Sequence, residues 1–255
     1  MALANRYQLF TLRKDSQLVG AAGIHVYPHL TDTKRAWVHD LIVVSDRAAF
    51  EYQSLLIAHL RDRCFRDGCA ELAIHVPIDD AIENQFFQQG IGQPFAFVYE
   101  WTSASWRSVH DRTSPMREPQ YREIRTSKDI ASGLALLTHF HSELTEASLA
   151  HAMENGYQIF GLWIDDQISS IATLIHYPHL KNKMCVWLQD GMVLPKRTYK
   201  EAASSLFHNV MNACFQSETL TVTVHARVRN RRIHQFYEAA GGHHTANAYK
   251  WKIRG

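Results

Sequence analysis

The sequence predicts an α/β protein built from two copies of one fold in tandem, each with a central sheet covered by helices. The first observation is an internal repeat at an offset of 150, in which residues 5–101 match residues 155–251 without a gap. Of these 97 pairs, 28 are identical, whereas random pairing at ordinary composition gives roughly 5–7. The second observation is the alternation of strand-like and helix-like segments within each copy, which is typical of helices packed on a sheet.

The elements of the first copy follow from its apolar spacing. Residues 7–12 and 18–26 predict a hairpin that turns at 14–17. The segment at 36–44, apolar except at His39 and Asp40, predicts a strand, and helical spacing of apolar residues predicts a helix at 50–66. The remaining predicted elements are a strand at 70–76, a helix at 80–89 and a strand at 95–101.

The second copy has a longer beginning than the first. Residues 121–154 precede its first matched residue, whereas four residues precede that of the first copy. This lead-in predicts a strand at 121–125, a helix at 129–141 and, after the cap residue Thr145, a helix at 146–155.

These segments divide the chain into three parts. We predict a truncated first domain at 1–101, a linker at 102–119 and a second domain at 120–255. The linker is rich in Ser, Arg and Pro and has no apolar periodicity.

Composition excludes several classes of protein. With 46% hydrophobic and 20% charged residues, the chain of 255 residues is neither disordered nor collagen-like. A net charge of +2 is too small to predict a nucleic-acid partner, and no apolar run is long enough to span a membrane. Four cysteines without a CxxC pair, and the absence of a secretory signal, predict reduced thiols and a cytoplasmic location.

The 16 histidines raise the possibility of a metal site. His139 lies two residues before His141, and His243 is followed by His244, but neither pair joins a Cys or a carboxylate at a recognised ligand spacing. We therefore expect no metal.

Two segments of the second copy resemble the motifs of the GNAT N-acetyltransferase superfamily. In that family, Arg/Gln-x-x-Gly-x-Gly/Ala opens a helix after the fourth strand, and residues 193–202 (VLPKRTYKEA) are similar to it. Arg197 and Ala202 fit this motif, while Lys200 stands where the family usually has Gly. The family also has an Asn after the fifth strand with a Phe-Tyr ending seven residues on, which 230–237 (NRRIHQFY) matches.

The resemblance implies a mixed, mostly antiparallel sheet in each copy, and acetyl-CoA as co-substrate. A helix N-terminus binds the pyrophosphate in this family, and a backbone N–H near Val193 would polarise the thioester carbonyl. By resemblance, Tyr237 protonates the leaving thiolate, and Asp190 is a candidate to orient water or deprotonate the amine. The resemblance implies these cofactor-binding residues: Met192, Val193, Arg197, Lys200, Glu201, Ala202, Asn230 and Tyr237.

Structural roles are the alternative for the same residues. Tyr237 could close the core, since its partner in the first copy is Phe87. Asp190 could make a structural hydrogen bond that is shared with Asp40. Arg197 could shape the loop, because it also recurs in the first copy.

The first copy departs from the motifs at the positions that carry chemistry. Phe50 and Tyr52 stand at the glycine positions, and Phe87 stands at the tyrosine position. Six cations of the second copy also lack a cationic partner here; they are Lys196, Lys200, Arg227, Arg229, Arg231 and Arg232. Because cations attract the phosphates of coenzyme A, we predict a catalytic second copy. The first copy is then pseudo-catalytic, and binds the second copy or a partner chain.

The predicted function is N-acetyl transfer from acetyl-CoA to an amine, by direct attack in a ternary complex. The alternative is a non-catalytic acyl-CoA-binding or protein-interaction module. Aminoacyl transfer from tRNA would require a more basic surface than a net charge of +2 supplies. The acceptor stays open between polyamines, antibiotics, amino acids and peptide amines, because acceptor specificity resides in the lead-in helices and loops.

Overall fold

The computed structural model describes residues 7–30, 33–45, 47–110, 120–139, 141–164, 166–179, 183–193, 200–217 and 219–252. The elements of the first copy are β1 Tyr7–Lys14, β2 Gln17–Pro28, β3 Lys34–Val43, α1 Ala49–Arg66, β4 Cys69–Pro77, α2 Ala81–Ile91 and β5 Ala96–Thr102. After α3 Ser103–His110, the second part contains β6 Gln120–Glu123, α4 Ser127–Leu137, α5 Glu146–Glu154, β7 Tyr157–Ile164, β8 Gln167–His179, β9 Lys183–Val193, α6 Lys200–Gln216, β10 Thr221–Arg227, α7 Arg231–Ala239 and β11 His243–Lys252. The predicted order of elements in both copies is confirmed.

Local chemistry explains where several elements begin and end. Asp15 and Ser16 join β1 to β2 with positive φ angles of 48° and 69°, as the tight turn of a twisted hairpin requires. Thr145 caps α5 in a reciprocal capping box with Ser148, which confirms the predicted helix start. The helix α4 ends earlier than predicted, because Thr138 is its C-cap and donates its hydroxyl to the carbonyl of Leu134 at 2.9 Å.

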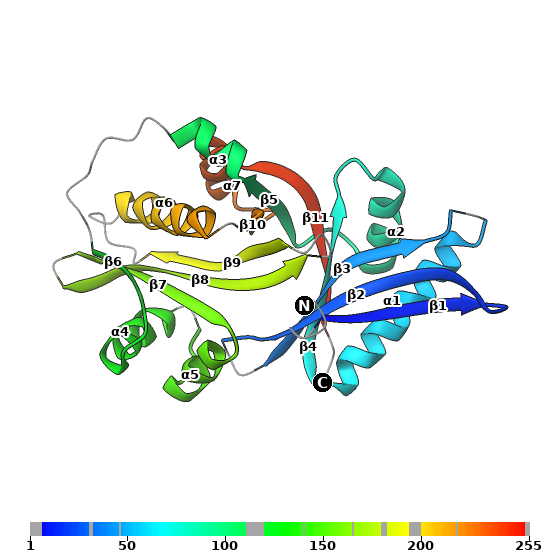
Figure 1. The fold of residues 1–255 in the computed structure, drawn as a ribbon, viewed down its shortest axis with the longest axis horizontal. Helices are drawn as coiled ribbons and strands as arrows, with labels where there is room; N and C mark the ends of the chain where they lie inside the picture. Colours follow the sequence, from blue (N-terminus) through cyan, green and yellow to red (C-terminus); the bar gives the residue numbers. More distant parts are fainter. Residues whose placement is uncertain are drawn as a thin grey trace.

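The two copies share one mostly antiparallel sheet. The strand order in the described residues is β1-β2-β3-β4-β11-β5-β10-β9-β8-β7-β6, with parallel pairs only at β3–β4 and β9–β10. Helix α6 lies on one side of the β7–β9 part of the sheet, and α4 and α5 lie on the other (Figure 1). Among the described residues, no helix is both long and apolar enough to cross a bilayer.

The last strands of the two copies are exchanged. Strand β5 of the first copy lies between β11 and β10, and β11 of the second copy pairs with β4 of the first. Figure 1 shows β11, in red, extending from the second copy into the first. In the β5–β11 ladder, Ala246 pairs with Val98 and Ala248 pairs with Ala96. Position 246 is equivalent to 96 and position 248 to 98, so each of these pairs is the counterpart of the other. The centre of the sheet therefore has an approximate twofold axis.

Hydrogen bonds hold each exchanged strand to the helix of the other copy. The Tyr249 hydroxyl on β11 donates to Asn84 Oδ1 on α2 at 2.9 Å. Its equivalent Tyr99 on β5 donates to Glu238 Oε1 on α7 at 3.1 Å. The exchange thus places a tyrosine from each half of the sequence in the core of the other half.

Helix α3 lies in the stretch that we predicted to be a linker. Its Trp106 is 3% exposed and packs against α6, where its indole N–H donates to Asn212 Oδ1 at 2.8 Å. Residues 111–119, the rest of that stretch, are outside the described residues. The sequence does not predict α3, because eight residues with one large apolar side chain show no helical periodicity.

Aromatic side chains fill the core at the twofold axis. Trp37 and its equivalent Trp187 are buried with ring centroids 4.4 Å apart. Beside them, Nε2 of His75 lies 2.7 Å from Nε2 of His225. One of these nitrogens donates its hydrogen to the other, so the two copies meet through matched residues.

Candidate active site

The two parallel strands of the second copy separate at the predicted cofactor site. Strands β9 and β10 pair from Val186–Val222 to Leu188–Val224, but β9 continues to Val193 and β10 to Arg227. A register shift in the β8–β9 ladder lies opposite Gln189, at the point where this pairing ends. Beyond it, the β10-facing edge of β9 has no strand partner among the described residues, so its backbone groups could pair with an extended ligand.

The predicted cofactor residues lie on the two elements that flank this opening. Met192 and Val193 end β9, while Lys200, Glu201 and Ala202 form the first turn of α6. Arg197 lies outside the described residues, and for Met192, Val193, Lys200 and Glu201 only the backbone is described. The structure thus brings the end of β9 and the start of α6 next to the opening.

Tyr237 and Ala202 belong to one buried cluster between α6, α7 and the sheet. Tyr237 is 7% exposed, and its ring contacts Tyr99, Trp101 and Phe207 with centroids 5.5–5.7 Å apart. Burial raises the pKa of its hydroxyl above the ordinary value, so the group is protonated at neutral pH. A protonated phenol can donate a proton or a hydrogen bond.

Asn230 has a structural role in addition to its predicted one. Its side chain caps α7 by accepting the N–H of Ile233 at 3.3 Å. The equivalent Asp80 caps α2 by accepting the N–H of Glu83 at 2.8 Å. Both copies therefore use this position to start a helix.

The hydrogen bond expected for the Asp190 position is present in the first copy. The Tyr7 hydroxyl donates to Asp40 Oδ2 at 2.6 Å. Burial, and to a smaller extent the interaction with Asp40, raises the pKa of this hydroxyl. In the second copy, Tyr157 donates to Gln189 Oε1 at 2.9 Å instead. Asp190 itself pairs through its backbone with Thr173, and its side chain is outside the description.

Tyr99 lies beside the candidate site, where the sequence did not predict it. It lies in the first half of the sequence, yet its ring centroid is 5.6 Å from that of Tyr237. Its hydroxyl is 3.1 Å from His234 Nδ1 and from Glu238 Oε1. Burial and Glu238 raise its pKa to about 12. The internal repeat aligns Tyr99 with an identical residue, Tyr249, which marks the position as a shared feature of the fold. The alignment does not say which copy each tyrosine contacts.

The equivalent place in the first copy is occupied by its own side chains. Tyr52 stands at the position of Ala202 and is buried, and Lys14 Nζ donates to its hydroxyl at 3.5 Å. Phe87 stands at the position of Tyr237 and stacks on Tyr249 with centroids 5.6 Å apart. Tyr52 therefore takes up more room than Ala202, while Phe87 lacks the hydroxyl of Tyr237.

A cavity of about 390 Å³ lies between the copies, at the other face of the second copy's sheet. Its lining includes Tyr27, Glu154, Tyr157 and His176. The cavity borders β9 at Met184, near the start of the strand, and the hydroxyl of Tyr157 bonds to Gln189 farther along the same strand. Among the described residues, no group of three or more His, Cys, Asp or Glu side chains could hold a metal ion.

Comparisons with known proteins agree with this fold. Residues 2–92, in the first copy, match the family model described as Acetyltransferase (GNAT) family. A tandem GNAT protein from the clavulanic acid biosynthesis pathway, solved without AcCoA, is similar with a TM-score of 0.58 and 14% identity, over 98% of this chain and 84% of that one. A GCN5-related N-acetyltransferase from Sphaerobacter thermophilus has a TM-score of 0.58 and 13% identity over 94% and 79%.

A conserved protein of unknown function from Staphylococcus epidermidis is also similar, with a TM-score of 0.54 and 12% identity over 94% of this chain and 92% of that one. No curated protein matches the sequence. The family match covers the first copy alone, so it bears on the fold and not on which copy holds a site.

Proposed function

We propose that this chain is a tandem GNAT protein that transfers an acetyl group from acetyl-CoA to an amine, because its first copy matches the family model and its whole length has the fold of a solved tandem GNAT protein. The GNAT fold supports acyl transfer in general. The choice of acetyl-CoA, of an amine acceptor and of the second copy as the site is our proposal.

We choose the second copy because of one difference between the copies: Ala202 stands where the first copy has Tyr52. Both residues face the sheet from the first turns of equivalent helices and are buried. Tyr52 is much larger than Ala202 and takes up more of the space beside its helix. We infer from this difference that the second copy is the one that accommodates a ligand beside the opening between β9 and β10.

Charge supports the same choice. Arg227, Arg229, Arg231 and Arg232 are all exposed where β10 turns into α7. The equivalent residues of the first copy are Pro77, Asp79, Ala81 and Ile82. Guanidinium groups bind phosphate oxygens with charge-assisted hydrogen bonds, so the phosphates of coenzyme A favour the second copy.

The proposed reaction is a direct acyl transfer. The amine nitrogen attacks the thioester carbonyl carbon, the C–N bond forms and the C–S bond breaks. A backbone N–H near Val193 stabilises the negative charge on the carbonyl oxygen. The amine loses one proton, for which Asp190 is the candidate acceptor, and the leaving thiolate takes one, for which Tyr237 is the candidate donor.

We propose that the acceptor amine enters from the cavity between the copies. The exposed carboxylate of Glu154 lies in its lining and would attract a cationic amine, such as a small amine or a peptide amine. Tyr157 and Gln189 connect this lining to β9.

A non-catalytic acyl-CoA-binding protein is the second candidate. The observation that favours it is the burial of Tyr237 among aromatic rings, since an acid in catalysis must reach the leaving sulfur. In this alternative the chain binds acetyl-CoA without turnover.

Calorimetric titration with acetyl-CoA tests the site. We expect one molecule bound per chain, and loss of binding in Arg197→Glu, because a carboxylate near the pyrophosphate repels it. Ala202→Tyr, which introduces the residue of the first copy, should also abolish binding. The matched control Tyr52→Ala changes the first copy and should leave the stoichiometry at one.

Turnover separates the two candidates. If wild type acetylates an amine from a panel and Tyr237→Phe binds acetyl-CoA normally but turns over at least about 100-fold more slowly, the enzyme assignment stands. Binding without turnover on any amine supports the second candidate. Two molecules bound per chain, or unchanged binding in Arg197→Glu, would contradict a single site in the second copy.

A further inference from the structure

Helix α3 occupies a defined seat on the second copy. The Trp106 ring packs against Phe207, His208 and Phe215 of α6, with centroids 5.2–6.4 Å away. Its indole N–H donates to Asn212 Oδ1 at 2.8 Å. We call this site on α6 the seat of Trp106. It consists of the rings of Phe207, His208 and Phe215 and the amide oxygen of Asn212.

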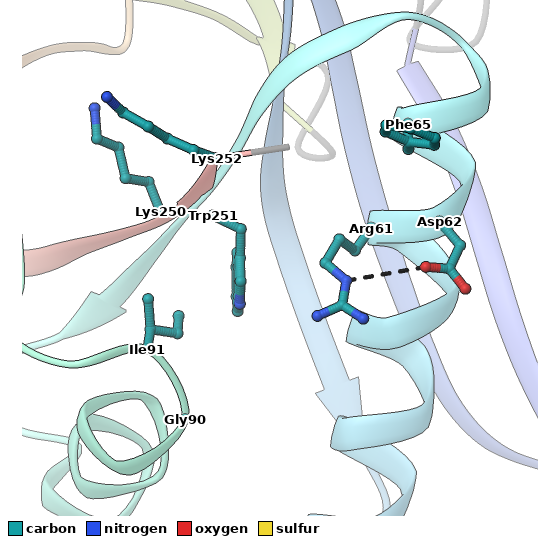
Figure 2. A pocket seen from close by; sticks show the side chains of 8 residues that line it. All are labelled: Arg61, Asp62, Phe65, Gly90, Ile91, Lys250, Trp251 and Lys252. Carbon is teal, nitrogen blue, oxygen red and sulfur yellow. Dashed lines mark ion pairs between the residues drawn. The ribbon is translucent and has the colours of Figure 1, made fainter. Parts of the chain in front are cut away.

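Part of an equivalent surface exists on the first copy, where the described residues leave it open. The equivalents of Phe207 and His208 are Ile57 and Ala58, which do not line it. A groove of about 620 Å³ is lined by Asp62 and Phe65 of α1, the end of α2 and Trp251 of β11. At an offset of 150, Asp62 corresponds to Asn212 and Phe65 to Phe215. Figure 2 shows Trp251 and Ile91 on one side of this groove and Asp62 and Phe65 on α1 on the other.

Aromatic side chains of the groove on the first copy are more exposed than their equivalents in the second copy. Phe65 is 56% exposed, whereas Phe215 is half-buried under Trp106. Trp251 is half-buried, whereas its equivalent Trp101 is fully buried. An aromatic side chain in the open groove would cover Phe65 as Trp106 covers Phe215, and removing apolar area from water favours binding.

The charge of the groove differs from that of the filled seat. Arg61 lies on the groove side of α1 (Figure 2) and Lys252 lies at the β11 margin. Their equivalents, Met211 and Thr102, are uncharged. The one acidic side chain in the lining is Asp62, whose carboxylate is 3.9 Å from Arg61 Nε and 70% exposed. A helix with acidic residues beside its aromatic anchor would complement this charge.

We propose that this groove binds a short helix of a partner protein, which inserts a tryptophan between α1 and Trp251 and carries acidic residues next to it. The indole N–H donates to the carboxylate of Asp62, as that of Trp106 donates to Asn212. This interaction is independent of acyl transfer.

The chain itself supplies the probe. We would label a peptide of residues 102–110 (TSASWRSVH) that carries Arg107→Glu, and titrate it with the full chain while measuring fluorescence anisotropy. We expect saturable binding of one peptide per chain. The unmodified peptide should bind more weakly, because its Arg107 faces a basic groove. A peptide with Trp106→Ala should lose at least about tenfold in affinity, since a buried tryptophan is an interface anchor.

Variants of the chain locate the binding. Phe65→Ala should weaken it at least about tenfold, and Asp62→Asn, which supplies the acceptor found in the second copy, should leave it within about twofold. The matched control is Leu55→Ala, because Leu55 is 50% exposed on the same helix but does not line the groove.

Three results would overturn the proposal. The first is an absence of saturable binding up to the solubility of the peptide, or equal binding to Phe65→Ala. The second is a dimer in sedimentation that Phe65→Ala converts to monomer, since the occupant is then a second copy. The third is tenfold tighter peptide binding by a chain that stops at Lys252, since residues 253–255 would then be the occupant.

Discussion

Two histidines from opposite halves of the sequence make the closest polar contact at the twofold axis. Burial lowers the pKa of His225 to about 3, with a smaller contribution from Lys250. Burial, the charge of His225 and that of His39 lower the pKa of His75 well below its ordinary value. Both imidazoles are therefore neutral in the folded protein near neutral pH, and their short Nε2–Nε2 hydrogen bond requires that at least one Nε2 carries no hydrogen.

Acid should destabilise the protein through this pair. Below about pH 6.5 an unfolded histidine binds a proton, whereas folded His225 does not until about pH 3. The free energy of unfolding therefore falls as pH drops through this window, by up to about 1.4 kcal/mol per pH unit for each histidine. We expect His225→Gln to reduce this slope in urea unfolding curves recorded from pH 4.5 to 7.5.

The control for this measurement is His243→Gln, which replaces an exposed histidine on β11. It should leave the slope of unfolding free energy against pH as it is in the wild type. A slope that is the same in His225→Gln and in wild type would remove the buried pair as the cause.

At the scale of elements, the cap of α7 lies beside the proposed cofactor site and has two separable roles. Asn230 accepts the N–H of Ile233, and it is also one of the residues for which the family resemblance implies cofactor binding. We expect Asn230→Ala to lower the free energy of unfolding by about 1 kcal/mol, because an N-cap oxygen is lost.

Asn230→Asp tests the second role, because Asp80 shows that a carboxylate caps the equivalent helix. This variant should unfold like the wild type but bind acetyl-CoA several-fold more weakly in calorimetry, owing to repulsion of the phosphates. Unchanged affinity in both variants would leave Asn230 with the capping role alone.

At the scale of the whole molecule, the exchanged strands join the two copies into one unit. In the sheet, β11 lies between β4 and β5, and β5 lies between β11 and β10, so separating the copies would break three antiparallel ladders. Trp101, in the first half of the sequence, is fully buried and donates its indole N–H to the carbonyl of Ala240 at 2.9 Å. Such connections favour a single cooperative transition.

A protease site placed within residues 111–119 tests this connection. After cleavage, we expect the two pieces to elute together and to unfold in one calorimetric transition. Dissociation of the pieces without denaturant, with each giving its own cooperative transition, would show that each copy folds independently. The same chain before cleavage is the control.

The sequence predicted the features that depend on neighbours along the chain. The turn at 14–17, the helix after Thr145 and the order of strands and helices follow from local spacing, turn residues and caps. The repeat showed which residues are equivalent, including Trp37 with Trp187 and Ala202 with Tyr52. The proposed site could be located this far, because helix starts and strand ends are local features.

Tertiary structure alone decided which partners these elements have. Tyr99 on β5 and Tyr249 on β11 are identical residues at equivalent positions, so either strand could complete the sheet of either copy. No local pattern in the sequence therefore shows that the last strands are exchanged. The seat of Trp106 and the contact between His75 and His225 likewise depend on residues more than 70 positions apart, brought together by the curvature of one shared sheet. The physical reason is that strand pairing is a non-local choice, whereas periodicity and capping are local ones.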